Sequence, residues 1–259
     1  MNKLLSFKKM HAQEHLLLLA NVWDTHSARI IEKVGFQAIA TSSAGIADYL
    51  GYKDGENISF SALYKMVKAI TSAVTLPVSV DIESGYSEEN YKIIEHVIRL
   101  ADLGVTGINI EDSFKGNKTG LKNICDQAEL LNQIKHRLDN QGYKDFFVNA
   151  RIDTYLQGYY TYEDTLERSK HYIESGADGI FVPGIQSSEE IRALAAAINV
   201  PLNVMSLPGL TDADTLYQLG VRRFSIGNAL ADANTAFISD TAKHLLEQKK
   251  TDMLYKAEA

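Results

Sequence analysis

Cysteine, proline and tryptophan are scarce in this sequence of 259 residues, and no long apolar run occurs in it. The single cysteine, Cys125, excludes an internal disulfide and favours a reducing compartment. The longest strongly apolar run, residues 16–20, is too short to cross a bilayer. Lys8, Lys9 and Glu14 interrupt the first segment, which therefore does not resemble a signal peptide. We expect a cytoplasmic protein with no membrane partner.

Positive charge is also in short supply. The 26 Lys and Arg residues are outnumbered by 33 Asp and Glu residues, which gives a net charge of −7, and no basic block is present. This composition argues against nucleic acid as a partner. Hydrophobic residues make up 45% of the chain, enough for a large packed core. An acidic protein that binds small acids has to supply positive charge locally, from a metal ion or a well-placed Arg.

Short apolar segments alternate with amphipathic ones along the whole sequence. Helices are predicted to begin at capping residues, among them Asp24, Ser87, Thr161, either Ser187 or Ser188, and either Thr211 or Asp212. The apolar segments have the nearly continuous character of strands that are covered on both faces. They are residues 16–22, 36–42, 78–83, 107–111, 146–153, 179–183, 202–206 and 223–227.

Eight strands that alternate strictly with eight helices predict right-handed crossovers and a parallel sheet. Neither a linker nor a composition break divides residues 1–259, and this length suits one (β/α)8 TIM-type barrel. No glycine-rich dinucleotide motif follows the first strand, which disfavours an open nucleotide-binding sheet. We therefore predict an α/β protein with a single barrel domain.

Three acidic residues fall where the active site of such a barrel lies, at the C-terminal ends of its strands. Asp81 and Glu83 are two residues apart on one strand and so share a face, and Glu111 ends the next strand. Three carboxylates at one barrel mouth repel one another unless a cation lies between them. Mg²⁺, with Mn²⁺ as an alternative, prefers such oxygen ligands. For any single acid, a helix cap or an ion pair is the simpler interpretation.

Arg151 ends the fifth predicted strand. A guanidinium group in this position can bind a substrate carboxylate through two parallel hydrogen bonds, and a salt bridge to Asp153 or Glu111 is the alternative. A metal ion beside Arg151 would chelate a 2-oxo acid and stabilise the enolate formed when a bond to the neighbouring carbon breaks.

Small residues follow the second predicted strand. Their backbone N–H groups and hydroxyls can bind a second carboxylate, although an ordinary strand-to-helix turn has the same composition. We predict that four of them bind substrate: Ser42, Ser43, Ala44 and Gly45.

Five motifs spread over nearly the whole chain form a specific combination. They are Asp24, Ser27 and Ala28 in D-x-x-S-A; Leu50, Gly51 and Asp54 in L-G-x-x-D; Asp81, Glu83, Gly85 and Tyr86 in D-x-D/E-x-G-Y-G; residues 110–112 in I-E-D; and residues 150–153 in A-R-x-D. In this combination the sequence resembles the isocitrate lyase/phosphoenolpyruvate mutase family.

The resemblance implies a magnesium-dependent, lyase-type enzyme. Its substrate would be a small 2-oxo or 2-hydroxy carboxylic acid, broken through a metal-stabilised enolate by C–C cleavage or decarboxylation. By the same resemblance the three acids surround the metal, Arg151 and residues 42–45 bind the substrate, and Asp54 lies near the metal as a catalytic residue. It also implies a homotetramer or homodimer that exchanges a C-terminal helix, residues 229–257.

One departure from the family matters. Its C–C lyases carry a K-x-C-G-H loop after the fourth strand, whereas residues 113–120 contain neither Cys nor His. Pro183 stands where isocitrate-type lyases place a Glu, so ordinary isocitrate lyase activity is not expected. Among the polar residues of the loop, Lys115, Asn117 and Lys118, we take Asn117 as the catalytic candidate.

Three alternatives stay open at this stage. The first is a mutase or hydrolase that acts on the P–C bond of phosphonopyruvate, since such members of the family also lack the loop Cys. The second is a barrel that binds an oxo acid without catalysis. The third is a phosphate-binding barrel of the sugar-isomerase kind that uses Gly209 and Gly227, which leaves the acidic residues unexplained.

Overall fold

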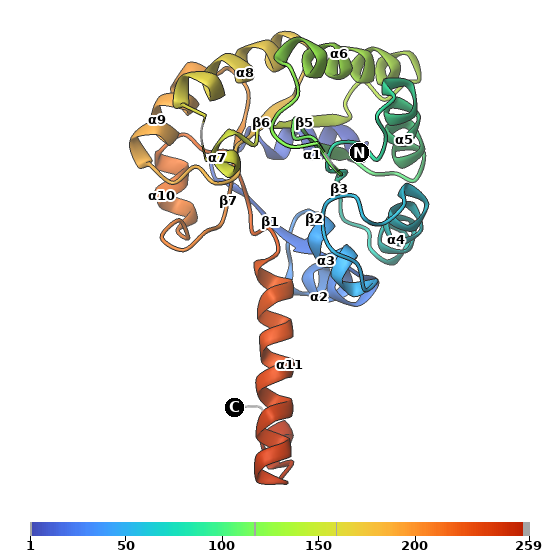
Figure 1. Ribbon diagram of the computed structural model, residues 1–259, viewed down its shortest axis with the longest axis vertical. Helices are drawn as coiled ribbons and strands as arrows, with labels where there is room; N and C mark the ends of the chain where they lie inside the picture. The colour runs from blue at the N-terminus through green and yellow to red at the C-terminus, as the bar shows by residue number, and fades with distance from the viewer. Residues whose placement is uncertain (1, 117, 159, 256–259) are drawn as a thin grey trace.

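The chain folds into a closed barrel of eight parallel strands, which confirms the predicted fold class (Figure 1). The computed structural model describes residues 2–116, 118–158 and 160–255. Each strand pairs with the next in the chain, and the last pairs with the first. The strands are β1 (Leu17–Val22), β2 (Ile39–Thr41), β3 (Val78–Asp81), β4 (Gly107–Glu111), β5 (Phe147–Arg151), β6 (Gly179–Phe181), β7 (Leu202–Met205) and β8 (Arg223–Ser225).

Helices surround the barrel and follow its strands in order (Figure 1). The strand-to-strand helices are α2 (Thr25–Val34), α4 (Phe60–Ala73), α5 (Asn90–Asp102), α6 (Ile124–Asn140), α8 (Tyr162–Glu174), α9 (Ser188–Ala197) and α10 (Ala213–Gln218), and α11 (Ala229–Gln248) follows β8. The prediction of eight helices was too low, because, besides a 3-10 helix at Asp252–Tyr255, the described chain contains three further α-helices. They are α1 (Lys3–Met10), α3 (Ser43–Tyr49) and α7 (Thr154–Gln157).

Most predicted helix starts are correct, and one is wrong. Asp24 and Ser27 form a reciprocal capping box at the start of α2, and Thr161, Ser187 and Asp212 cap their helices through their side chains. Ser87 was predicted to begin the helix after β3, but this helix, α5, starts later, at Asn90.

The reason for the later start of α5 lies in the turn before it. Tyr86 has a φ of 60°, and its backbone N–H donates to the Glu56 carboxylate, so the chain is still turning at Tyr86. The hydroxyl of Ser87 accepts a hydrogen bond from Glu89 N, which leaves Ser87 outside the helix.

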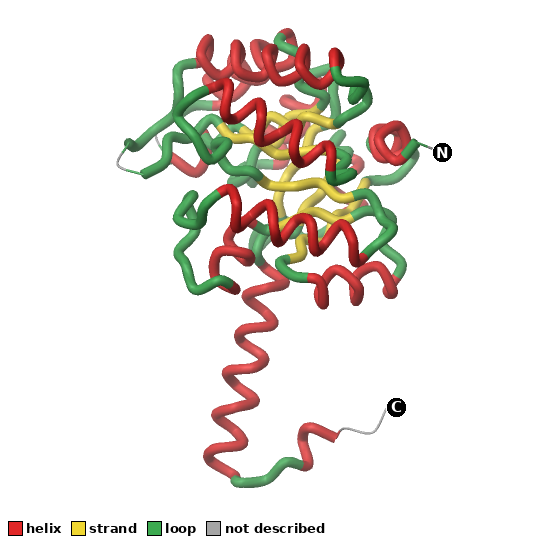
Figure 2. The backbone as a smooth tube through the Cα atoms, turned by 90° about the vertical axis from the view of Figure 1, so that its right-hand side faces the viewer, coloured by secondary structure: helices red, strands yellow, loops and turns green. Residues whose placement is uncertain are grey.

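The helix α1 closes the end of the barrel at which the strands begin, and Figure 2 shows it beside the barrel next to the N-terminus. Phe7 is completely buried and packs edge-on against Phe147 at a centroid distance of 5.9 Å. Leu17, Leu19, Ala38 and Ala40 complete this apolar cluster. The other end of the barrel, where the strands end, is therefore the open one.

The helix α11 projects away from the barrel in both views (Figures 1 and 2). It has no buried residue, and Phe237 and Ile238 are 69% and 58% exposed. The predicted helix 229–257 is too long, because α11 ends at Gln248, followed by Lys249 with a φ of 52°; residues 256 and 257 lie outside the described part. Among the described residues, no helix is both long and apolar enough to cross a membrane.

Candidate active site

A cavity of about 220 Å³ opens where the strands end, and most residues predicted to bind substrate line it. Side chains from the ends of β2, β3 and β5 meet there, as expected for a barrel of this type. The predicted site residues that line it are Ser42, Ser43, Ala44, Asp54, Asp81 and Arg151. Glu83, Glu111 and Gly45 are not among its lining residues.

The three predicted metal ligands are held together by two basic side chains. Lys115 Nζ lies 2.5 Å from Glu111 Oε1 and 3.1 Å from Glu83 Oε2. Arg151 Nη1 lies 2.8 Å from Glu111 Oε2 and 3.8 Å from Asp81 Oδ2. The acids thus converge, but Lys115 now lies between two of them.

Arg151 is shared between the cavity and its own neighbour on the chain. Its Nε and Nη2 donate to the two oxygens of Asp153 at 2.6 and 3.1 Å, and Ser113 Oγ donates to the same carboxylate at 2.6 Å. Asp153 and Glu111 therefore engage three of the five N–H groups of Arg151. Two N–H groups remain for a ligand, and the salt bridges that the sequence offered as an alternative role are both present.

Burial makes the charged form of these acids costly. Burial raises the pKa of Asp81, Glu83 and Glu111, that of Glu111 to about 8, and the cations beside them offset this only in part. For Lys115 and Arg151, burial opposes the charged form, but the surrounding carboxylates outweigh it and raise both pKa values. Two cations therefore serve four carboxylates in this group, because Asp153 also depends on Arg151.

These residues fit a hard divalent cation in their chemistry, although not in their present arrangement. The donors are carboxylate oxygens, and neither Glu111 oxygen accepts a well-directed hydrogen bond despite its ion pairs. As the side chains stand, no three acidic, His or Cys residues of the described chain are grouped so that they could hold a metal ion. A cation between Glu83 and Glu111 would take the position of the Lys115 ammonium group.

Glu83 is fixed by a strained turn that the sequence did not reveal. Glu83 has a φ of 49°, an uncommon value for a residue with a side chain. Its Oε2 accepts a hydrogen bond from Glu56 N at 2.9 Å, and its Oε1 accepts one from Tyr86 Oη at 2.9 Å. The Glu56 carboxylate in turn accepts from Ser84 N and Oγ and from Tyr86 N. Glu56 therefore holds the turn that presents Glu83.

The small residues after β2 have distinct positions. Ser43 Oγ donates to Asp81 Oδ2 at 3.1 Å, and Ser42 Oγ donates to Asn228 Oδ1 at 2.8 Å. Gly45 lies behind them, where an added Cβ would meet Asn228 Oδ1 at 3.0 Å. The backbone therefore requires a small residue at position 45 for close packing.

Of the predicted catalytic residues Asp54 and Asn117, the structure describes only Asp54. Asp54 is exposed at the cavity, and its negative charge contributes to the raised pKa of Asp81 and Glu83, after burial. Asn117 lies outside the described residues.

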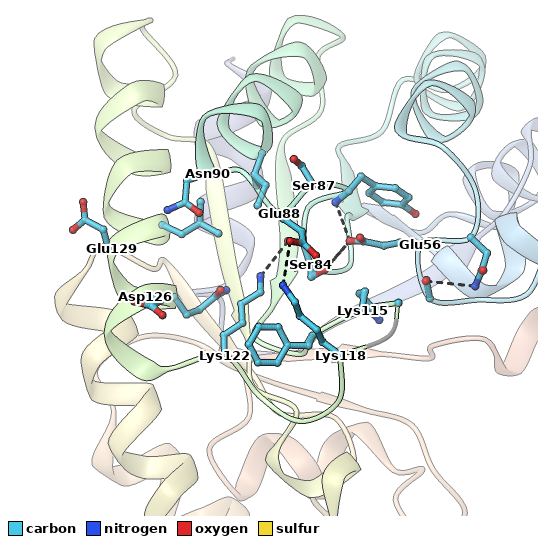
Figure 3. Close-up of a pocket in the computed structure, with 18 residues that line it drawn as sticks. Glu56, Ser84, Ser87, Glu88, Asn90, Lys115, Lys118, Lys122, Asp126 and Glu129 are labelled. Carbon is cyan, nitrogen blue, oxygen red and sulfur yellow. Dashed lines mark hydrogen bonds and ion pairs between the residues drawn. The ribbon is translucent and has the colours of Figure 1, made fainter.

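A second, larger cavity of about 610 Å³ lies beside the first, between the turn after β3 and the start of α6. Figure 3 shows Lys118 and Lys122 in it, with Lys118 paired to Glu88 and Lys122 donating to the carbonyl of Ser84. Lys115 lines this cavity but not the first, and its ammonium group pairs with Glu83 and Glu111. The segment that carries the loop residues therefore lies over the acidic group.

Sequence reasoning missed two functional positions. Glu56 lies in the loop after α3, where only its spacing from Asp54 would have drawn attention to it. Asn109, on β4 two residues before Glu111, shares a strand face with it and lines the cavity. The alternation along β4 would have identified Asn109.

Comparisons with known proteins identify the family of this chain. The family model described as phosphoenolpyruvate phosphomutase matches residues 7–246. An uncharacterized protein of Mycobacterium tuberculosis is 38% identical over 225 residues, 86% of this chain and 82% of that one. Oxaloacetate decarboxylase 1 of Pseudomonas fluorescens is 28% identical over 250 residues, 95% of this chain and 84% of that one.

A comparison with solved structures also finds proteins described as lyases and mutases. A Burkholderia cenocepacia protein, provisionally described as a lyase/mutase, superposes with a TM-score of 0.92 at 30% identity, over 99% of this chain and 92% of that one. The match of the family model over most of the chain, together with the barrel and its acidic mouth, identifies the family. The chain belongs to the isocitrate lyase/phosphoenolpyruvate mutase family, whose members are lyases and mutases.

Proposed function

We propose that this protein is a magnesium-dependent decarboxylase of a small 3-carboxy-2-oxo acid, a four-carbon diacid in the simplest case. One observation carries the proposal. The cavity at the barrel mouth is small, is lined by Arg151 and Asp81, and has no His, Cys, Tyr or Lys among its described lining residues. It offers groups that bind and orient an acid, but no evident acid–base pair.

Decarboxylation is the C–C cleavage that makes the least demand on such a site. When the bond to the departing carboxylate breaks, CO₂ leaves and the electron pair stays on the remaining fragment as an enolate, which water can protonate. Cleavage of a 2-hydroxy acid would also require a base for the hydroxyl proton. Asp54 and Asp81 are the only carboxylates among the described lining residues, and Asp81 is assigned here to the metal, so the 2-oxo substrate, which needs no base, is favoured over the 2-hydroxy one.

The charged residues at the barrel mouth have distinct roles in this proposal. The two remaining N–H groups of Arg151 bind the substrate carboxylate next to the oxo group, and Asp153 holds the guanidinium in place. The donor set Asp81, Glu83 and Glu111 would hold Mg²⁺, directly or through water. Bound there, the ion supplies Lewis-acid stabilisation of the enolate oxygen. The named activity of the Pseudomonas relative supports the choice.

Chemistry at a P–C bond is the second candidate, and one observation favours it. The matching family model is that of a phosphomutase, and Lys115 supplies an ammonium group beside Glu83 and Glu111 to which a phosphonate could bind. In the structure, however, the ammonium group of Lys115 is engaged by Glu83 and Glu111. A phosphonate ligand would have to draw it away from both.

A substrate panel separates these candidates. Purified protein with Mg²⁺ is incubated with oxaloacetate, 2-methylisocitrate or phosphonopyruvate, and pyruvate and phosphate are measured. We expect pyruvate from oxaloacetate at a rate well above that of an Asp81→Ala variant, which controls for spontaneous decarboxylation. Phosphate from phosphonopyruvate alone would replace the proposal with the second candidate. Oxo-acid binding by calorimetry without turnover of any compound would indicate a non-catalytic barrel.

A further inference from the structure

The interior of the barrel beneath the cavity is polar, although branched apolar side chains usually fill this space. Its central residue is Arg223 of β8, which has no exposed surface. The buried polar side chains around the centre of the barrel belong to Ser79, Asn109, Asn149, Asn203 and Ser225. A buried charge without a charged partner lowers the stability of the fold. Its presence here therefore points to a functional role.

Arg223 has no carboxylate partner among the described residues. Its Nη2 donates to Ser79 Oγ at 3.1 Å and to Asn109 Oδ1 at 3.0 Å, while Nε and Nη1 have no hydrogen-bond partner there. On its other side lies the ring of Phe7, with its centroid 6.0 Å from Cζ. Burial lowers the pKa of Arg223 to about 9, with the negative charge of Asp81 acting in the opposite direction. The positive charge thus lies directly under the site.

The contacts of Arg223 fix the orientation of Asn109. A guanidinium group has donors only, so the side-chain oxygen of Asn109 must face it. Asn149 Nδ2 donates to the same oxygen at 2.9 Å. With its acceptor engaged from inside the barrel, Asn109 directs its amide N–H groups the other way. Asn109 lines the cavity, and no described residue accepts a hydrogen bond from its Nδ2.

We propose that Arg223 is a positioning residue that holds Asn109 with its amide N–H groups toward the cavity, where they donate to an oxygen of the bound oxo acid. This inference rests on the proposed function, and it adds a second contact, from β4, to the one that Arg151 supplies from β5. A carboxylate or enolate oxygen is the acceptor that suits a neutral donor backed by a buried cation.

Oxalate, a small dianion with the shape of the enolate, tests the proposal by calorimetry in the presence of Mg²⁺. Asn109→Ala and Arg223→Met should each weaken oxalate binding by about tenfold or more, as expected for a hydrogen bond to a charged group. The double variant should bind no more weakly than Asn109→Ala alone, because the two residues act as one unit. Arg223→Lys should recover part of the affinity, since an ammonium group can also donate to Asn109 Oδ1.

Asn109→Asp gives a readout that a purely structural role would not produce. The new carboxylate would pair with Arg223 and raise the melting temperature, yet it would repel oxalate and lower its affinity. This one substitution is therefore expected to raise stability and to lower oxalate affinity. Because it does not alter Arg223, the test stays valid if Arg223→Met fails to fold. Arg222→Met is the matched control, since the side chain of Arg222 packs on Tyr217 instead, and its oxalate affinity should equal that of the wild type.

The outcomes separate this inference from the proposed function. Additive losses in the double variant, or an unchanged affinity in Asn109→Asp, would overturn the role of Arg223 while leaving decarboxylation intact. Coupled losses in a protein that decarboxylates no oxo acid would overturn the proposed function alone. A wild-type protein that binds no oxalate would contradict both.

Discussion

Lys115 Nζ lies 2.5 Å from Glu111 Oε1, in the position where the sequence predicts a divalent cation. The ammonium group and a metal ion therefore compete for the same carboxylates. We expect Lys115→Met to raise the affinity for Mn²⁺ by about tenfold or more, which corresponds to about 1.4 kcal/mol. Titration with Mn²⁺ by electron paramagnetic resonance measures this directly. Lys118→Met, on the same loop but paired with Glu88, is the control and should leave the affinity unchanged.

Arg151→Lys should weaken substrate binding by about ten- to a hundredfold, because a Lys ammonium cannot hold Asp153 and still offer a paired contact to the carboxylate. The affinity for oxalate in the presence of Mg²⁺ measures the effect. Unchanged affinity would show that Arg151 serves Asp153 and Glu111 alone and does not contact the substrate.

His11 provides a test of the closed end of the barrel. It stacks on Phe147 at a centroid distance of 4.0 Å, and its burial, together with the charge of Arg223, lowers its pKa to about 3. In the unfolded chain His11 binds a proton below its ordinary pKa of 6.5, whereas in the folded chain it does so only near pH 3. Stability is therefore lost as the pH falls from 6.5 toward 3, with a slope of up to about 1.4 kcal/mol per pH unit from this residue.

Denaturant unfolding at several pH values measures this slope in the wild type and in His11→Phe, which keeps the ring stacked on Phe147. The variant should lose less stability between pH 6.5 and pH 4, and the difference between the two curves isolates His11 from the acids. Parallel curves would mean that His11 is protonated in the folded protein.

The helix α11 is a candidate for contact with a second copy of the chain. A helix with no buried residue gains little from its own sequence, since most helical stability in proteins comes from tertiary packing. We propose that α11 packs against a neighbouring subunit through Phe237 and Ile238. Replacement of both by Asp should convert the oligomer to a monomer of 28.7 kDa in analytical ultracentrifugation. Tyr91→Asp, on the exposed face of α5, should not. A monomeric wild type would contradict the proposal.

The sequence predicted the barrel well because its signals are local. Apolar segments of the right length mark the strands, and capping residues such as Asp24 and Thr161 mark where helices begin. The strand ends then identify Asp81, Glu111 and Arg151 by topology alone, since parallel strands end at the same side of a barrel.

What the sequence did not predict depends on contacts between distant segments. Only the three-dimensional structure decides whether Arg151 binds Asp153 or a substrate. Here Arg151 donates two hydrogen bonds to Asp153, and its remaining N–H groups can bind a substrate. The pairing of Lys115 with Glu83 depends on the path of the loop after β4. The sequence gives the length of this loop but not its path. Arg223 reads as the start of an apolar strand, and only the closed barrel places its guanidinium group beneath the cavity.

We propose that Asp81, Glu83 and Glu111 bind a divalent cation that also holds the oxo acid. Titration of Mn²⁺ into the wild-type protein and into Asp81→Ala, each with and without oxalate, measures it by the electron paramagnetic resonance signal of free Mn²⁺. We predict one tight Mn²⁺ per wild-type chain, bound more strongly with oxalate, and loss of this binding in the variant at an unchanged melting profile. Equal binding by both proteins, or none by the wild type, would contradict the account.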